Sequence, residues 1–224
     1  MHLLLLSATD IEISETASWL NNHTSGLNAL NAKLLISGIG QLQTAYALQN
    51  RIRFERPDLV IQAGIGGAAL NEDIGRVYAI RSEQIADIGV MEKSGFRNIF
   101  DMGLQNRDRF PFADGKLENP YRSLIGWSCL PVFDGLTVNE IKSSDFTGIQ
   151  RNPLRFVESM EGAALHYVCL MEKIPFLQIR AISNITGDRD KSRWKIKEAL
   201  KALHSELVVI IQKLEKADET LFRI

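Results

Sequence analysis

The sequence predicts an α/β protein in which helices cover both faces of a mostly parallel sheet. Short apolar runs, typical of buried strands, alternate with segments of helical periodicity through residues 1–63. The alternation returns in residues 158–217, and the 224 residues contain neither a repeat nor a recognisable linker. We therefore expect a single domain that spans residues 1–224.

Composition excludes several classes of function. Apolar residues make up 45% of the chain, charged residues 24%, and the formal net charge is -1. The chain has no basic stripe that would predict a nucleic-acid partner. It also has no concentration of one charge sign that would predict a membrane partner. The apolar run at residues 3–6 is shorter than the roughly 7–15 residues of a signal peptide. No segment approaches the roughly 18 apolar residues of a membrane span. We expect a soluble, cytoplasmic protein.

The amino-terminal part should contain three strands separated by two helices. The strands are expected at residues 3–7, 34–36 and 59–63. Asp10 is placed to cap the first helix. The second helix should span residues 41–54 and face the core through Leu42, Ala45, Tyr46 and Leu48.

The regular alternation stops after the third strand. The glycine-rich run Gly64–Gly67 should mark the end of that strand, and a turn follows at residues 71–75. Residues 76–88 are expected to form one or two strands, and further strands are expected at 127–132 and 136–141. The intervening residues 91–120 have no clear period, which is typical of a binding lid, a subunit contact or a disordered segment.

The carboxy-terminal part returns to helix and strand. A helix should begin at Met160-Glu161, a buried strand should span residues 176–182, and a long amphipathic helix should span residues 191–217. The strand ends at Ser183-Asn184. Open α/β sheets bind ligands at the carboxyl ends of their strands, so Asn184 is a candidate for chemistry, although a turn-stabilising role is the alternative.

The glycines at residues 64–67 fit the G-x-G-x-x-A form of the dinucleotide fingerprint. That fingerprint requires a helix directly after it, whereas the sequence predicts a turn at residues 71–75. We therefore do not favour a dinucleotide cofactor. The glycines would still let a ligand approach the backbone closely, and a tight turn without a ligand is the alternative. No two histidines have metal-ligand spacing, so we expect neither a metal nor an organic cofactor.

Most glutamates are exposed to solvent, but the positions of two of them suggest a role in a site. Glu12 follows the first strand, and Glu161 lies beside Met160 among small residues. The second setting suits a buried carboxylate near a sugar, because a carboxylate can accept hydrogen bonds from both hydroxyls of a ribose.

Three segments in order give the chain a recognisable pattern: Gly64–Gly67, Met160–Ala164 and Arg180–Asn184. Together they resemble the nucleoside phosphorylase/nucleosidase superfamily, and within it the sequence is most similar to the futalosine hydrolase family. The resemblance implies a three-layer α/β/α fold with a central mixed, barrel-like β-sheet flanked by helices. It also implies a homo-oligomer and a small-molecule nucleoside substrate. The implied reaction is hydrolysis of the N-glycosidic bond of futalosine, which releases hypoxanthine in menaquinone biosynthesis.

The resemblance also assigns site residues. Glu12 and Asn184 would be catalytic. The substrate-binding residues would be Gly66, Gly67, Met160, Glu161 and Ser183. Glu12 would activate water as a general base. Related phosphorylases carry an arginine at the position of Gln62 and a serine at the position of Ile65. Phosphate is held by such cationic and hydroxyl groups, so their absence here favours hydrolysis over phosphorolysis.

The identity of the base follows from residue 184. Related adenine-specific enzymes carry an aspartate there, which can donate to N7 and accept from an amino group. Hypoxanthine presents two acceptors, N7 and O6, and the Asn184 amide offers two donors. The leaving base would take its proton from solvent, Asp188 or Asp190. The distal benzoate of futalosine would need a cation or backbone donors. Arg97, Arg107 and Arg109 are candidates, although surface solvation is favoured for each.

Three alternatives stay open. A purine nucleoside phosphorylase would depend on added phosphate. A methylthioadenosine/adenosylhomocysteine nucleosidase would release adenine, which Asn184 argues against. A non-catalytic purine-binding protein on the same scaffold would bind hypoxanthine without turnover.

Overall fold

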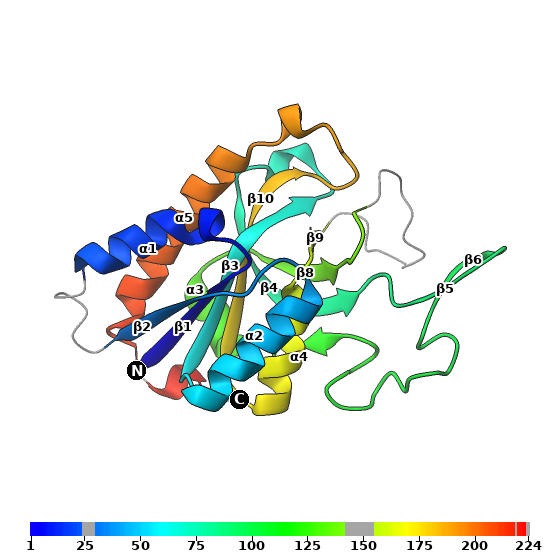
Figure 1. The fold of residues 1–224 in the computed structure, drawn as a ribbon, viewed down its shortest axis with the longest axis horizontal. Helices are drawn as coiled ribbons and strands as arrows, with labels where there is room; N and C mark the ends of the chain where they lie inside the picture. Colours follow the sequence, from blue (N-terminus) through cyan, green and yellow to red (C-terminus); the bar gives the residue numbers. More distant parts are fainter. Residues whose placement is uncertain (24–29, 142–154, 218, 223–224) are drawn as a thin grey trace.

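The computed structural model describes residues 1–23, 30–141, 155–217 and 219–222 (Figure 1). The elements follow in the order β1 (His2–Ser7), α1 (Asp10–His23), β2 (Asn31–Ile36), α2 (Gln41–Phe54), β3 (Leu59–Ala68), η2 (Asn71–Asp73), β4 (Val77–Ile85), β5 (Gly89–Glu92), β6 (Gly95–Asn98), β7 (Leu117–Glu118), α3 (Arg122–Ser128), β8 (Val132–Thr137), β9 (Phe156–Ser159), α4 (Gly162–Glu172), β10 (Phe176–Ile185), η3 (Lys191–Arg193), α5 (Ile196–Leu214) and η4 (Glu219–Phe222).

Five strands close into a ring at the centre of the molecule. Strand β3 pairs with β10 in parallel, β10 with β4 antiparallel, β4 with β8 in parallel, β8 with β9 in parallel, and β9 with β3 antiparallel. Strands β1 and β2 extend the sheet outward from β3 in parallel. The prediction of a mixed, barrel-like sheet is confirmed, and closure gives each of the five ring strands a partner on both sides.

Burial explains why the central strands are continuous apolar runs. All but one of the ten residues of β3 are buried, and so are the first eight of β10. Strand β2, at the outer edge, contains no fully buried residue. A strand covered on both faces cannot alternate polar and apolar residues, whereas an edge strand can.

Helices cover the sheet on two sides. In Figure 1, α1 and α5 lie on one side, and α2 and α4 lie together on the other. Helix α5 buries one apolar stripe, composed of Ala199, Leu203, Leu207, Ile210, Ile211 and Leu214. Burial of each large side chain contributes roughly 1.5–3 kcal/mol, so this stripe accounts for the position of the helix. The helix begins at Ile196, and the short η3 turn occupies the expected first residues.

The predicted inward face of α2 is confirmed for Leu48, which is buried, and for Ala45, which packs against the core. It is wrong for Leu42, which is 85% exposed, and for Tyr46, which is 75% exposed. Besides Leu48 the helix buries Thr44 and Ile52, so its buried residues recur every four positions. Thr44 can be buried because its hydroxyl pairs with that of Ser37 at 3.1 Å. The sequence reading took the larger apolar side chains for the core.

The predicted strand at residues 127–132 is also wrong. Residues 122–128 form helix α3, which ends at Cys129 with a left-handed φ of 62°. The following strand, β8, ends at Thr137, so it overlaps only the first two residues of the expected strand at 136–141. Short apolar runs do not distinguish a buried helix from a strand.

The irregular segment at residues 91–120 includes part of a two-stranded hairpin, β5–β6, and the short strand β7, which pairs with β4.

Among the described residues, no helix is both long and apolar enough to cross a membrane.

Candidate active site

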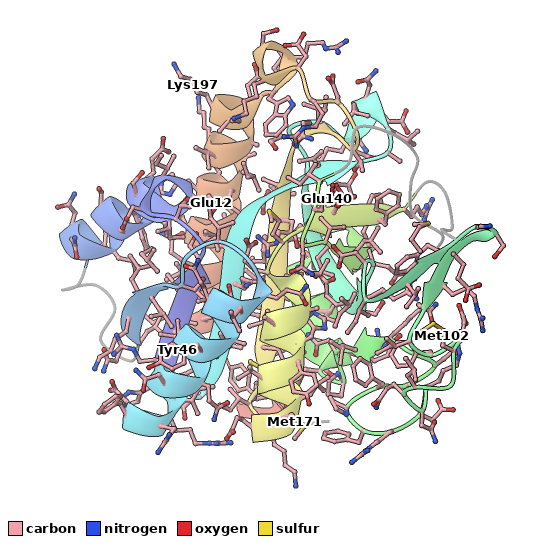
Figure 2. The ribbon with its side chains drawn as sticks, turned by 45° about the vertical axis from the view of Figure 1, so that its right-hand side comes forward. Glu12, Tyr46, Met102, Glu140, Met171 and Lys197 are labelled. Carbon is pink, nitrogen blue, oxygen red and sulfur yellow. The ribbon has the colours of Figure 1, made fainter. Side chains whose placement is uncertain are left out.

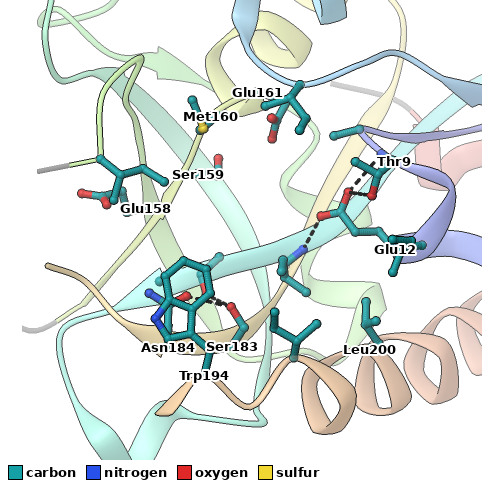
Figure 3. Close-up of a pocket in the computed structure, with 18 of the residues that line it drawn as sticks. Thr9, Glu12, Glu158, Ser159, Met160, Glu161, Ser183, Asn184, Trp194 and Leu200 are labelled. Carbon is teal, nitrogen blue, oxygen red and sulfur yellow. Dashed lines mark hydrogen bonds between the residues drawn. The ribbon is translucent and has the colours of Figure 1, made fainter. Parts of the chain in front are cut away.

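A pocket of about 360 Å³ lies at the carboxyl ends of β3 and β10, beside the first turn of α1. Its volume suits a small-molecule ligand. Figure 3 shows Thr9 and Glu12 on one side, Ser183, Asn184 and Trp194 on another, and Met160 and Glu161 at the corner between β9 and α4. All seven residues assigned by the resemblance line this pocket. The roles assigned to them are considered below.

Strand β3 continues through the glycine run and reaches Ala68, instead of ending at residue 63 as expected. A Cβ atom at Gly64 would overlap the side chains of Arg180 and Glu12. One at Gly66 would overlap Val157, and one at Gly67 would lie 3.3 Å from Asn184 Nδ2. The glycines therefore permit close approach within a strand and do not mark a turn. The dinucleotide fingerprint is excluded, because a 3₁₀ turn follows at residues 71–73 in place of a helix.

Glu12 is held in the pocket by donors from two elements. Its Oε2 atom accepts hydrogen bonds from the backbone N–H and the hydroxyl of Thr9, at 3.1 and 3.0 Å. The Ser7 hydroxyl also approaches Oε2, at 3.4 Å. Its Oε1 atom accepts from the backbone N–H of Ile65, at 3.0 Å. A carboxylate has about four acceptor positions, so Oε1 keeps one free for a ligand or water.

Glu161 is buried at the amino-terminal cap of α4. Its Oε1 atom accepts a hydrogen bond from the backbone N–H of Gly40, at 3.0 Å. Its Oε2 atom lies 3.5 Å from Nη2 of Arg180, which is 1% exposed. The same Nη2 atom donates to Gln62 Oε1 at 2.9 Å. The arginine thus compensates the buried carboxylate, and open acceptor positions on Glu161 can face the pocket.

The amide of Asn184 is placed by an irregularity in β10. The register between β10 and β3 shifts between Ile182 and Asn184, so Ser183 is an extra residue. Such bulges re-aim side chains near binding sites. The Ser183 hydroxyl donates to Asn184 Oδ1 at 2.8 Å, and Asn184 Nδ2 donates to the carbonyl of Ile185 at 3.0 Å. The amide keeps one of its two N–H donors for a ligand, whereas the sequence argument counted on both.

The loop before α5 closes the amide side of the pocket. Trp194 lines the pocket, and its indole N–H donates to the carbonyl of Asp188 at 3.0 Å. The Asp188 carboxylate accepts from Arg193 at 2.9 Å. Hydrogen bonds from Ser192 lower the pKa of Asp190, so this carboxyl is ionised at neutral pH. Neither aspartate is among the residues that line the pocket, which weighs against both as proton donors.

The described lining of the pocket contains neither lysine nor arginine. Gln62 is turned onto Arg180, and Ile65 offers only an aliphatic side chain. Arg97 and Arg107, proposed for the far end of the substrate, lie outside the pocket and pair with acidic groups of their own segment. Arg109 also lies outside the described lining.

Sequence reasoning missed several residues that build the site. Arg180 was visible as a charge inside an apolar strand, and that signal could have identified it. Ser7 ends the first strand and Thr9 follows it, but nothing in the sequence shows that both turn toward Glu12. The bulge at Ser183 depends on pairing with β3, which leaves no local signature.

Solved structures share this fold. The chain matches a putative 5'-methylthioadenosine/S-adenosylhomocysteine nucleosidase from Francisella philomiragia with a TM-score of 0.77 and 16% identity, over 95% of this chain and 99% of that one. It matches a futalosine hydrolase of Helicobacter pylori with a TM-score of 0.72 and 12% identity, over 95% and 98%. The chain therefore has the fold of the nucleoside phosphorylase/nucleosidase proteins.

Curated relatives narrow the assignment. The chain is 30% identical to a futalosine hydrolase of Streptomyces coelicolor, over 91% of this chain and 92% of that protein. It is also 30% identical to one of Thermus thermophilus, over 80% of each. A 5'-methylthioadenosine/S-adenosylhomocysteine nucleosidase of Chromohalobacter salexigens is 26% identical over 92% and 94%. No model of a protein family matches the chain. The chain belongs to the futalosine hydrolase family.

Proposed function

We propose that this protein hydrolyses the N-glycosidic bond of futalosine and releases hypoxanthine, without a cofactor. One arrangement carries the proposal: three carboxylates, Glu12, Glu158 and Glu161, and the neutral amide of Asn184 line one pocket, whose described lining contains no basic side chain. Glycosidic cleavage moves positive charge onto the sugar and negative charge onto the base. Carboxylates stabilise the first, and an amide N–H stabilises the second.

Glu161 and Met160 hold the sugar in this mechanism. The ribose hydroxyls donate to the open acceptor positions of Glu161, whose orientation is fixed by Gly40 and Arg180. Met160 packs against the sugar ring, and the backbone at Gly66 and Gly67 leaves room for it.

Glu12 delivers the nucleophile. The free position on its Oε1 atom accepts a proton from water as that water attacks the anomeric carbon. The departing base lies beside Ser183 and Asn184, and the remaining N–H of the Asn184 amide donates to N7 or O6 of hypoxanthine. The proton for the base comes from solvent, since Asp188 and Asp190 are engaged elsewhere.

Three substrates, each with and without phosphate, test this function. Purified protein should release hypoxanthine from futalosine at a rate independent of phosphate, and should cleave inosine and methylthioadenosine far more slowly. A requirement for phosphate would establish a phosphorylase instead. Preferred release of adenine from methylthioadenosine would establish the adenine-specific nucleosidase, to which the relatives at 26% identity correspond. Binding of hypoxanthine without turnover of any substrate would establish a binding protein.

The resemblance also implies a homo-oligomer, and we propose that α2 and α4 form its contact. Their outer faces expose Leu42, Tyr46, Tyr167 and Met171. Figure 2 shows the two helices side by side, with Tyr46 on one and Met171 on the other. Exposed apolar side chains on adjacent helices are typical of a protein interface. We also infer a cytoplasmic location and a step in menaquinone biosynthesis.

Light scattering measures the oligomeric state directly. Leu42→Glu with Tyr46→Glu should yield monomers, because two charges would be buried in the contact. Val209→Glu, on an exposed position of α5 across the sheet, is the control and should leave the mass unchanged. A wild-type monomer would contradict this contact without bearing on the reaction.

A further inference from the structure

Glu83 is a fully buried carboxyl group that does not line the pocket. It projects from β4 between two glycines, Gly135 of β8 and Gly162 of α4. A Cβ atom on either glycine would overlap the Glu83 carboxyl group. The first residue of α4 therefore packs directly on this group, and the preceding residue is Glu161.

A hydrogen-bonded chain joins Glu83 to the first turn of α4. The Thr137 hydroxyl donates to Glu83 Oε2 at 2.8 Å. The same hydroxyl oxygen accepts from the backbone N–H of Ala163, also at 2.8 Å. Ala163 follows Glu161 by two positions, and this N–H has no partner within the helix. Glu83 thus holds the turn that presents Met160 and Glu161 to the pocket.

The other oxygen of Glu83 leads to a second buried pair. Gln178 Nε2 lies 2.7 Å from Glu83 Oε1. Gln178 neighbours His166, and both Gln178 Oε1 and His166 Nε2 lack a hydrogen-bond partner. His166 Nδ1 lies 2.8 Å from the carbonyl of Leu117, so Nδ1 carries the proton and Nε2 is an acceptor. Two buried acceptors on neighbouring residues are therefore left without a donor.

One proton on Glu83 resolves this conflict. Rotating the Gln178 amide by half a turn exchanges its oxygen and nitrogen positions. A protonated Glu83 then donates to Gln178 Oε1, and Gln178 Nε2 donates to His166 Nε2. Every member of the chain is satisfied, and no net charge is buried with it.

The electrostatic surroundings agree with a proton on Glu83. The pKa of Glu83 is raised to about 7, mainly by burial and also by the nearby Glu161, against the lowering effects of Gln178, Thr137 and Arg180. Burial lowers the pKa of His166 to about 4, so the imidazole is neutral.

We propose that Glu83, carrying its proton, is a positioning residue: it holds the first turn of α4 and thereby the orientation of Met160 and Glu161 toward the sugar. The inference rests on the sugar-binding role proposed above for these two residues. It adds a group that touches no substrate atom and acts through Thr137 and the backbone of α4.

Paired variants of Glu83 and Thr137 test the proposal. Glu83→Ala and Thr137→Val both break the chain, and each should lower kcat/KM for futalosine about 10²-fold, mainly through KM, because small displacements of a binding group have such effects. Glu83→Gln, a neutral isostere, and Thr137→Ser should recover kcat/KM to within about fivefold of wild type, because each restores the hydrogen-bond pattern. Hypoxanthine affinity should be unchanged throughout, because the base contacts Ser183 and Asn184.

Asp73→Asn is the matched control, because Asp73 is also buried but pairs with Tyr78 away from α4. It should leave kcat/KM unchanged. Wild-type kcat/KM should contain a component that declines above about pH 7, and Glu83→Gln should lack it. Should Glu83→Ala fail to fold, the two Thr137 variants carry the test.

Three results would overturn the proposal. Glu83→Ala or Thr137→Val could retain kcat/KM within about threefold, which leaves no positioning effect. Glu83→Gln could be as impaired as Glu83→Ala, which would require an ionised carboxylate. Hypoxanthine affinity could fall in parallel with kcat/KM, which would indicate general damage. If wild type does not cleave futalosine, the proposed function fails, and the same variants are compared on the nucleoside that it does cleave.

Discussion

The two sides of the pocket differ in charge and in how they are held. Each carboxylate of the first side, Glu12 and Glu161, accepts at least one hydrogen bond from a distant part of the chain: Ile65 lies 53 positions from Glu12, and Gly40 lies 121 from Glu161. Glu12 also accepts from Thr9, three positions away. The amide side, centred on Asn184, is oriented by its own neighbours alone. The distant donors tie the two carboxylates to other elements of the fold, because reorientation would leave those donors unpaired.

This difference suits a reaction that separates charge. The sugar needs fixed negative groups as it becomes positive, and the departing base needs a donor that does not compete for its own proton. In the proposed mechanism the charged groups, the half-buried Glu12 and the buried Glu161, lie on the sugar side, and a neutral group is left for the base. Four predictions test that division.

The largest effect is expected at Glu12. Glu12→Gln removes the base that activates water and should lower kcat about 10²–10⁴-fold, while hypoxanthine binding is retained. Single-turnover release of hypoxanthine measures the step. Glu15→Gln, at an exposed position of the same helix, is the control. A loss of only a few-fold would show that the carboxylate side does not supply the base.

The second largest effect is expected at Glu83, which supports the turn that carries Glu161. It should appear in how the free energy of unfolding depends on pH. Between pH 4.5 and about 7 the folded protein keeps a proton on Glu83 that the unfolded chain has released, so stability falls as pH rises. The shift from 4.5 to about 7 corresponds to roughly 3.4 kcal/mol, or roughly 300-fold in the folding equilibrium. Glu83→Gln lacks this loss, so its stability relative to wild type should increase over that range.

Urea denaturation at several pH values measures this difference. His166 acts in the opposite direction, because its lowered pKa makes stability rise between about pH 4 and 6.5. The two effects oppose each other in wild type, and the histidine effect alone should remain in Glu83→Gln. A relative stability that does not vary with pH would place the Glu83 pKa near its ordinary value.

A smaller effect is expected on the amide side. Asn184→Asp replaces the donor to the base with a carboxylate and should lower kcat/KM for futalosine about 10- to 50-fold, the value of one lost hydrogen bond in a buried site. Asn50→Asp, exposed on α2, adds the same charge elsewhere and should have no effect. Unchanged activity with Asn184→Asp would remove the basis for selecting a 6-oxopurine.

The smallest effect is expected at Asp190. Asp190→Asn should change kcat/KM less than about threefold, because this carboxyl is already ionised and lies outside the pocket lining. The pH profile of kcat should likewise keep its acidic limb. A loss of about 10²-fold would identify a proton donor on the amide side and break the contrast between the two sides.

Local patterns were sufficient to predict much of the fold. The buried runs at residues 3–7, 59–63 and 176–182 lie in strands β1, β3 and β10, because a strand covered on both faces shows its burial in its own composition. The face of α2 was misjudged, because nothing local shows that Thr44 finds a buried partner in Ser37. The helix at residues 122–128 was missed because seven residues are too few to display a period.

Some residues of the candidate site could likewise be predicted from local sequence, and others could not. Glu12, Glu161 and Asn184 follow recognisable elements, so their positions could be predicted. Arg180 entered the sequence analysis only as part of the segment Arg180–Asn184, because its two acceptors come from other elements: Gln62 lies on β3, and Glu161 precedes α4. Contacts between segments so far apart in the chain have no counterpart in local sequence.

The glycine run of β3 limits how this pocket could acquire another activity. Between Gly64 and Gly67 the wall presents main chain alone, apart from the aliphatic side chain of Ile65. A Cβ atom at Gly64 or Gly66 would overlap the atoms opposite, and one at Gly67 would be tightly packed. A cationic or hydroxyl group able to hold an attacking anion would therefore most readily enter at Ile65 or Gln62, the positions of this wall where a side chain already fits.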